Sequence, residues 1–322
     1  MAFQFSRAIV CELADSYATA ALGLSSPVDM ALARQQWRAY VEALESLGCQ
    51  VTVLPADERF PDCVFVEDTA VIVQGHALLT QPGDPSRRDE IENMKPVLEK
   101  QGLVVMQVKN PVAKLDGGDV IFTGKEILVG LSSRTNQEGV DAIAEAFPGF
   151  PVTGIPVSGP LHLKTLLTMS GPNTFCASSQ SGHSTAMLKR IQSLAKFEYK
   201  SLIVNDDMAS NVIYMNGALL HKSWTESKES AETFCSYCSR TCPGEGPTRS
   251  IDLDLSEIEK AVGSPTCMSL RFSQNGLVGH VGLAKGQTLA DGEQLVLQDW
   301  EVHCALTNII NILNNQLCRY FQ

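Results

Sequence analysis

Short apolar runs interrupted by turn residues recur along the chain and predict β-hairpins. Three clear copies pair residues 71–73 with 77–79, 120–122 with 127–129, and 212–214 with 218–220, and each pair is separated by a turn containing glycine. Two weaker copies run from Thr174 to a turn near Ser178 and from Met268 to a turn at Asn275 and Gly276. The recurrence indicates an internal structural repeat.

Several hairpins are followed by apolar residues at helical spacing and then by a short strand. A longer amphipathic stretch near the N-terminus, residues 30–47, ends at Gly48. The other helical stretches cover residues 91–98, 140–147 and 187–194, and short strands are predicted at 51–54 and 103–106. The predicted unit is therefore hairpin, helix, strand, repeated about five times, with the N-terminal helix and strand completing the last copy.

Units of this size cannot bury their apolar faces alone and are expected to close radially, as propeller blades do. A doubly wound sheet is the competing α/β architecture, but it predicts parallel strands rather than recurrent hairpins. We therefore expect an α/β propeller of five blades with pseudo-five-fold symmetry. No Gly-x-Gly-x-x-Gly or other phosphate-cradling loop occurs, so a nucleotide site has no support.

The composition is that of an ordinary globular chain, with an acidic balance. Among 322 residues, 36 acids stand against 25 bases, a net charge of −11. Such a charge argues against nucleic-acid and membrane partners and suits a small cationic ligand. No apolar run approaches the roughly 20 residues that span a bilayer, and the N-terminus does not resemble a secretory signal. We expect a cytoplasmic protein.

Ten scattered cysteines indicate a reducing compartment with free thiols rather than a disulfide framework. Cys235, Cys238 and Cys242 lie close together in the segment 224–249, just before a stretch rich in proline and glycine at 243–247. They could be three ligands of a zinc site, but no second pair with ligand spacing follows. Free thiols in a variable loop are the favoured interpretation.

Polar residues gather at the ends of the predicted units. Asp116 and Asp119 enclose two glycines, His162 lies in an apolar alternation, and Cys267 precedes a methionine. Taken singly, each has a structural explanation: a turn, a hydrogen-bonded core histidine, and a small buried hydrophobe. Only their combination favours a functional site.

Taken together, the motifs resemble dimethylarginine dimethylaminohydrolase, a family of the guanidine-modifying superfamily, whose fold is a five-bladed α/β propeller. The resemblance covers about residues 5–272, in order and at family spacing. The matching strings are DCVFVED at 62–68, PSRR at 85–88, LDGGD at 115–119, VGLS at 129–132, RTNQ at 134–137, LHLK at 161–164, DDMA at 206–209, LSEIEK at 255–260 and TC at 266–267.

The resemblance implies a catalytic role for three residues and guanidinium binding by two. Cys267 would be the nucleophile, His162 the general acid and base, and Asp116 the group that orients the histidine. Glu67 and Asp68 would hold the planar guanidinium, which needs carboxylates in its plane.

The resemblance also implies how the amino-acid end of the substrate is bound. Arg87 and Arg134 would bind the α-carboxylate. Asp62, with the backbone carbonyls of Leu22 and Ala261, would bind the α-amino group.

The implied reaction is hydrolysis of Nω-methylated arginines to citrulline and dimethylamine or methylamine, through a covalent thiouronium on the cysteine. The chemistry needs no metal and no organic cofactor. Zinc could inhibit by binding Cys267 and His162, because thiolate and imidazole are ordinary zinc ligands. The implied partner is a small cationic amino acid, and the implied protein is a monomer or a weak homodimer.

Two other functions remain open. An arginine deiminase or amidinotransferase would keep the fold and nucleophile but release a different product. A catalytically inactive binding protein would keep only the fold. The residues Val262, Ser264 and Pro265 depart from the family pattern beside the nucleophile.

The family pattern stops at Ser273. We expect a catalytic domain at residues 1–276 and a C-terminal extension of unknown role at 277–322, with an apolar stripe at helical spacing over 306–320.

Overall fold

Five small sheets of three strands each make up the fold of the residues that the computed structural model describes, 3–158 and 162–273. The sheets have the strand orders β15-β1-β2, β3-β4-β5, β6-β7-β8, β9-β10-β11 with β10 central, and β12-β13-β14. In chain order the strands are β1 (Arg7–Cys11), β2 (Gln50–Leu54), β3 (Ala70–Val73), β4 (His76–Leu79), β5 (Val104–Gln107), β6 (Val120–Phe122), β7 (Ile127–Leu131), β8 (Val152–Pro156), β9 (Leu167–Gly171), β10 (Thr174–Ser178), β11 (Lys200–Val204), β12 (Ile213–Met215), β13 (Ala218–Lys222), β14 (Arg249–Leu253) and β15 (Leu270–Phe272).

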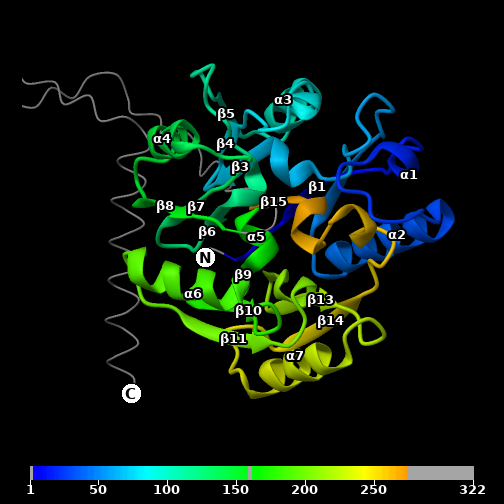
Figure 1. The fold of residues 1–322 in the computed structure, drawn as a ribbon, viewed down its shortest axis with the longest axis vertical. Helices are drawn as coiled ribbons and strands as arrows, with labels where there is room; N and C mark the ends of the chain where they lie inside the picture. The colour runs from blue at the N-terminus through cyan, green and yellow to red at the C-terminus, as the bar shows by residue number, and fades with distance from the viewer. Residues whose placement is uncertain (1–2, 159–161, 274–322) are drawn as a thin grey trace, which may run out of the picture. The chain divides into compact units, whose positions relative to one another are not determined.

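Every sheet is built in the same way. Its central strand pairs antiparallel with one neighbour and parallel with the other, as β4 does with β3 and β5. A helix connects the central strand to the parallel one: α2 (Met30–Ser46), α3 (Glu90–Lys100), α4 (Gln137–Ala146), α6 (His183–Leu194) and α7 (Lys228–Arg240). Figure 1 shows these helices at the periphery and the sheets inward of them. The predicted hairpin-helix-strand unit and the mixed α/β class with a five-fold repeat are confirmed.

The two ends of the described chain complete one sheet. Arg7 lies opposite Phe272, and Ile9 lies opposite Leu270, so that β15 pairs antiparallel with β1. Strand β1 also pairs parallel with β2. The prediction that the N-terminal helix and strand complete the last unit is confirmed, although the antiparallel partner of β15 is β1 itself. The turn expected at 275–276 lies outside the described residues.

Turn chemistry explains why the hairpins were visible in the sequence. Asn216 and Gly217 have φ of 50° and 78°, as a two-residue turn with left-handed backbone requires. The fourth hairpin was misplaced: its turn lies at Pro172 and Asn173, between β9 and β10, rather than near Ser178. Asn173 accepts a φ of 55° at low cost, whereas the polar residues after Ser178 lead into α6.

The segment expected to be a variable loop contains α7. Ala231, Phe234 and Cys238 form its buried face, while Cys235 and Cys242 are exposed. The thiol of Cys238 donates to the carbonyl of Arg249, in the neighbouring strand β14. The serine- and cysteine-rich composition hid the helical period, because few of the buried positions carry large apolar residues.

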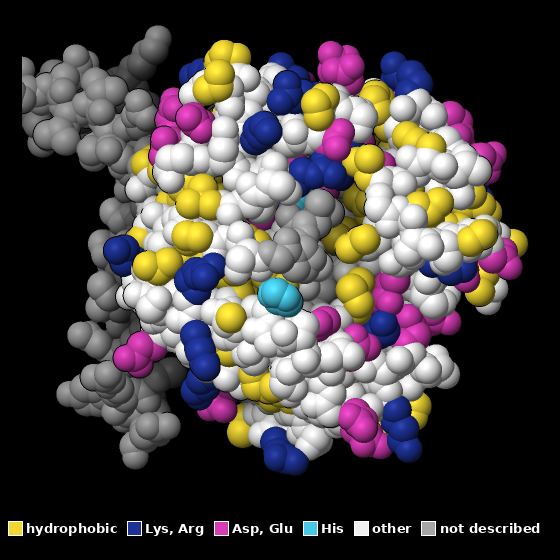
Figure 2. Space-filling view, viewed as in Figure 1, with side chains coloured by type: hydrophobic (Ala, Val, Ile, Leu, Met, Phe, Trp, Pro, Cys, Tyr) yellow, Lys and Arg dark blue, Asp and Glu magenta, His cyan; other side chains and the backbone are white. Residues whose placement is uncertain are grey.

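None of the helices in the described part of the chain is long and apolar enough to cross a membrane. On the face drawn in Figure 2, lysine and arginine side chains are interspersed with acidic ones. The expected domain boundary at 276–277 and the apolar stripe over 306–320 lie outside the described residues.

Candidate active site

The candidate site is built from short helices that occupy one equivalent position in the repeats, within two residues of the strand that follows. These are η1 (Val66–Thr69), η3 (Gly117–Asp119), α5 (Leu163–Leu166), η4 (Met208–Ser210) and, before β15, η6 (Pro265–Met268). The segment η1 contacts both η3 and η6, and α5 contacts η3 and η4. Residues that are distant in sequence therefore converge: Glu67 and Asp68 from η1, Asp116 before η3, His162 before α5, and Cys267 from η6.

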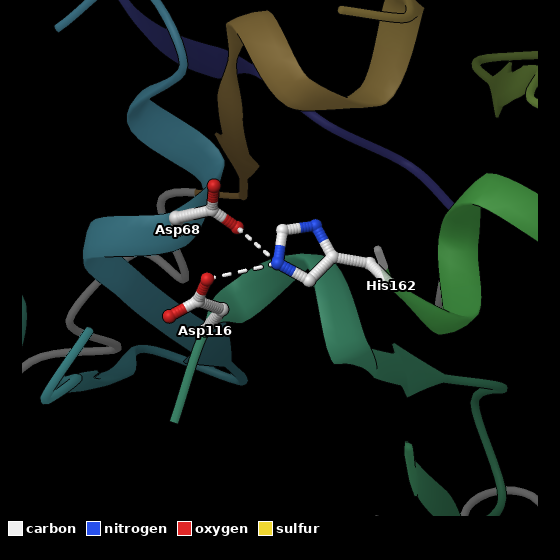
Figure 3. A group of neighbouring side chains, drawn as sticks. All are labelled: Asp68, Asp116 and His162. Carbon is white, nitrogen blue, oxygen red and sulfur yellow. Dashed lines mark hydrogen bonds and ion pairs between the residues drawn. The ribbon is translucent and has the colours of Figure 1, made fainter. Parts of the chain in front are cut away.

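One ring nitrogen of His162 faces two carboxylates, those of Asp68 and Asp116 (Figure 3). Its Nε2 is 2.8 Å from Oδ2 of Asp116 and 4.0 Å from Oδ1 of Asp68. The ring also packs on Gly118, where a Cβ would lie 2.6 Å from Nδ1. The second glycine of the Asp-Gly-Gly-Asp motif is thus required because the imidazole lies directly against the backbone.

The acidic surroundings favour the charged imidazole. Burial alone would lower the pKa of His162, but Asp68, Asp116 and Asp119 together raise it to about 9. Conversely, although burial opposes ionisation of Asp68, His162 and Arg87 lower the pKa of its carboxyl group. Near neutral pH the site therefore holds an imidazolium beside the ionised carboxylate of Asp68.

Arg87 is buried and is bound mainly by protein groups. Its Nη1 donates to Oδ2 of Asp68 at 2.5 Å, and its Nε and Nη2 donate to the two carboxylate oxygens of Glu90 at 2.9 and 2.8 Å. Nη2 also faces the carbonyls of Asp62 and Phe65. These contacts hold Asp68 in place. Glu90 was not predicted as a site residue, although its position three residues after Arg87 on a helical segment was a usable signal.

Among the residues that the structure describes, the guanidinium of Arg134 has fewer protein partners than that of Arg87 and is better able to bind an anion. Its Nη1 is buried and makes no hydrogen bond within the described residues, although Oδ2 of Asp84 forms an ion pair with it at 3.3 Å. Backbone contacts fix the arginine: its N–H donates to the hydroxyl of Ser132, and its main chain packs so closely on Gly83 that a Cβ there would clash.

Asp119 links two of the site's elements. Its Oδ1 accepts the N–H of Leu163, the residue after His162, at 2.8 Å. Its Oδ2 accepts the hydroxyl of Ser132 at 2.6 Å, and that hydroxyl accepts the N–H of Arg134. One fully buried carboxylate therefore positions the backbones that carry His162 and Arg134. The sequence identified Asp119 as part of a motif but not this role.

The residues expected at the amino group lie together. The carboxylate of Asp62 accepts the N–H of Leu22 at 3.1 and 3.2 Å. Ser25 donates its N–H to the carbonyl of Lys260, so residues 22–25 run beside the segment that contains Ala261. Burial raises the pKa of Asp62, and Arg87 partly offsets this effect.

Glu67 fixes the residue that precedes the cysteine. Its Oε1 is 2.6 Å from Nζ of Lys164, and its Oε2 accepts the hydroxyl of Thr266 at 3.0 Å. Thr266 also donates its N–H to Asn211. Burial, followed by the charges of Glu67 and Asp68, raises the pKa of Cys267 to about 12. Lys164, Thr266 and Asn211 were not predicted as site residues.

One group in the described part of the chain has metal-ligand geometry: the ligand atoms of Asp68, Asp116 and His162 lie within 4.8 Å of one another. Their oxygens already accept from Arg87, Gly118 and Gly83. Cys267 is not part of this group, and zinc inhibition through Cys267 and His162 stays a prediction. The three cysteines at 235–242 do not form such a group either.

Comparisons with known proteins identify relatives of this chain. A human relative, DDAH2, named as a hydrolase without a stated substrate, is 34% identical over 239 residues, which are 71% of this chain and 80% of that protein. The N(G),N(G)-dimethylarginine dimethylaminohydrolase of Streptomyces coelicolor is 36% identical over 250 residues, 77% of this chain and 88% of the relative.

A solved structure from Pseudomonas aeruginosa matches with a TM-score of 0.71 and 28% identity, covering 84% of this chain and 100% of the other. That structure is a cysteine-to-serine variant of the dimethylarginine dimethylaminohydrolase, complexed with citrulline. The model of the eukaryotic N,N dimethylarginine dimethylhydrolase family matches residues 12–272. The chain therefore belongs to the dimethylarginine dimethylaminohydrolase family.

Proposed function

We propose that this protein hydrolyses Nω-methylated arginines, asymmetric dimethylarginine and monomethylarginine, to citrulline and dimethylamine or methylamine. The observation that carries the proposal is the convergence of Cys267, His162 and two guanidinium-binding carboxylates at equivalent ends of the repeated units, in a chain of this family. The substrate is a small cationic amino acid, which suits a site rich in buried carboxylates.

In the first half of the reaction, the Cys267 thiolate attacks the guanidinium carbon. Protonated His162, held by Asp116 at 2.8 Å, donates its proton to the departing methylated amine. A thiouronium remains on the cysteine. Neutral His162 then takes a proton from water, the resulting hydroxide attacks the same carbon, and citrulline leaves as the thiolate is restored.

The substrate itself helps to form the thiolate. Without ligand, the charges of Glu67 and Asp68 add to burial in disfavouring ionisation of Cys267. A guanidinium bound between these carboxylates neutralises their field and places a positive charge beside the sulfur. Cys267 is therefore expected to lose its proton to solvent on substrate binding rather than in the free enzyme.

The amino-acid end is bound on the other side of the site. Arg134 offers a buried Nη1 to the α-carboxylate, and Asp62 offers its carboxylate to the α-amino group, together with the carbonyls of Leu22 and Ala261. Direct binding of the α-carboxylate by Arg87 stays a prediction, since its contacts with Asp68 and Glu90 support a role in holding the guanidinium-binding carboxylate.

Product analysis tests the proposal. The full chain is incubated separately with asymmetric dimethylarginine, monomethylarginine and plain arginine, and citrulline and the released amine are quantified. We expect citrulline with dimethylamine or methylamine, and no turnover by Cys267→Ser, because oxygen is a far poorer nucleophile. Cys176→Ser, a change at a fully buried thiol on β10, is the matched control and should retain activity.

Other outcomes would contradict the proposal. Ammonia from plain arginine as the main product indicates a deiminase, and turnover only with a second amine indicates an amidinotransferase. Methylarginine binding without turnover indicates an inactive binding protein. Retention of a tenth of the wild-type rate by Cys267→Ser excludes Cys267 as the nucleophile.

We propose that the protein acts in the cytoplasm as a monomer or a weak homodimer. All the proposed site residues belong to one chain, so catalysis requires no second copy. Light scattering over a range of concentrations measures the oligomeric state, and specific activity should not change across that range. A rise in specific activity with dimer formation would contradict this expectation.

A further inference from the structure

Two cysteines outside the candidate active site are held side by side. Cys11 ends β1, and Cys63 lies just before η1. Both side chains belong to the same apolar cluster and line the same cavity, and each thiol shifts the pKa of the other. Cys11 Sγ also lies 3.5 Å from the carbonyl of Pro55, and Cys63 Sγ lies 3.7 Å from the carbonyl of Glu12, the neighbour of Cys11.

A cavity of about 490 Å³ is lined by both cysteines. Its walls include the apolar side chains of Phe60 and Met94, and exposed Glu58 and Asn93 also line it, so it reaches the surface. A water molecule occupies about 30 Å³ in the liquid, so a hydroperoxide fits easily. Glu90, the partner of Arg87, lines the same cavity.

The two thiols have different acidities. A hydrogen bond that Cys11 can donate to the Cys63 thiolate lowers the pKa of Cys63, against the opposing effect of burial. The same contact, together with burial and the charges of Glu90 and Glu12, raises the pKa of Cys11. The thiolate is the form that reacts with oxidants. Cys63 is therefore expected to react before Cys11, and before Cys267, whose pKa is raised to about 12.

We propose that Cys11 and Cys63 form a modification site for small hydroperoxides, which convert the pair to a reversible disulfide. The Cys63 thiolate attacks the O–O bond, giving a sulfenic acid and hydroxide, which takes up the proton that Cys63 released. The sulfur of Cys11 then attacks Cys63, and the hydroxyl group leaves with the Cys11 proton as water. The two thiols lose two electrons, and hydrogen peroxide is reduced to two molecules of water.

We expect the disulfide to displace the segment that contains Asp62 and so to weaken substrate binding. This expectation rests on the proposed function. A disulfide joins its sulfurs at about 2.05 Å, so the two side chains must approach each other, and we expect the segment at Cys63 to shift toward β1. Its neighbour Asp62 binds Leu22 through the carboxylate and faces Arg87 through the carbonyl. We expect oxidation to raise KM for methylarginine at least threefold, reversibly with dithiothreitol.

Peptide mapping tests the site independently of activity. The full chain is treated with limiting hydrogen peroxide, alkylated, digested and analysed by mass spectrometry. The expected product is a cross-link between the Cys11 and Cys63 peptides, formed before any oxidation of Cys267. Cys11→Ser should give no cross-link and should leave a sulfenic acid on Cys63 that dimedone traps. Cys176→Ser is the matched control and should form the cross-link normally.

The outcomes separate the site from its effect and from the proposed function. Oxidation of Cys267 without a Cys11–Cys63 cross-link overturns the modification site. A complete cross-link with unchanged KM overturns the effect on substrate binding. A reduced protein that forms the cross-link but never hydrolyses methylarginine supports the modification site and overturns only the proposed function.

Discussion

Because His162 is protonated in the folded state, the free energy of unfolding is expected to depend on pH in the neutral to alkaline range. Its ordinary pKa of 6.5 is raised to about 9 because, despite burial, three aspartates stabilise the imidazolium. The folded state therefore holds a proton that the unfolded state has lost, and this stabilisation is complete below pH 6.5 and disappears as pH rises through about 9. We expect the free energy of unfolding to fall with pH in that window, by up to about 1.4 kcal/mol per pH unit.

Urea unfolding at several pH values measures this slope, and His162→Gln supplies the control. The variant lacks the titrating group, so the difference between the two curves isolates the histidine from other groups, such as Glu259, whose pKa burial raises to about 7. Identical slopes for the two proteins would show that His162 is neutral in the fold.

The backbone conformation of Val262 is expected to lower the free energy of unfolding. Its φ is 61°, in the left-handed region that β-branched residues avoid, and it lies next to Ala261. Asparagine adopts this conformation more readily, so Val262→Asn should raise the free energy of unfolding by roughly 1 kcal/mol. The midpoint of urea unfolding measures the gain. Val262→Ile keeps the β-branch and should show none, and equal stability of the asparagine variant would refute the strain.

At the residue scale, the sequence predicted the reacting residues better than the residues that position them. Asp116 and His162 were assigned by resemblance, and the structure brings them within 2.8 Å. The links made by Asp119 and Glu90 were not predicted, because they depend on contacts with Leu163 and Arg87 that only the folded chain defines. A motif indicates which residue types are required but not which backbone groups each carboxylate holds.

At the element scale, the start of α4 shows how a helix cap supports the site. Oδ1 of Asn136 accepts the N–H groups of Gly139 and Lys114, and its Nδ2 donates to the carbonyl of Val112. The cap therefore fixes the loop that leads to Asp116. Asn136→Ala should lower the free energy of unfolding by about 2 kcal/mol, since it removes a cap and the loop contacts together.

Chemical denaturation measures this loss, with Asn136→Asp as the control. The aspartate keeps the acceptor for both N–H groups and loses only the donation to Val112, so it should be less destabilised than the alanine variant. If the two variants lose equal stability, the cap contributes little and the amide donation dominates.

Elements with strong local signals were predicted, and those without them were not. The hairpins at Gly75, Gly124 and Gly217 combine alternating apolar residues with a turn, and the structure has strands on both sides of each. The helix α7 was missed because, apart from Phe234, its buried residues are small, and the turn at Asn173 was misplaced to the polar residues after Ser178. Tertiary packing, rather than local propensity, decides such segments.

At the scale of the molecule, repetition explains how a site forms from distant segments. Each unit presents a short helix before its first strand, so side chains from different units meet where these helices contact one another. Figure 1 shows the five sheets following one another in chain order around a common centre. The convergence of Asp68, Asp116, His162 and Cys267 is therefore a property of the repeat and not of any one unit.

The closure of the last sheet leads to a prediction about the C-terminal residues. Strand β15 ends at Phe272 and completes its sheet with β1 and β2, and every proposed site residue precedes it. We therefore expect deletion of residues 277–322 to leave kcat/KM for methylarginine within about threefold, a barrier change below about 1 kcal/mol. Steady-state kinetics on the full and truncated chains, with light scattering for oligomeric state, measures this. A folded truncation without activity would show that residues 277–322 build part of the site, and the boundary of the catalytic domain would then lie beyond residue 276.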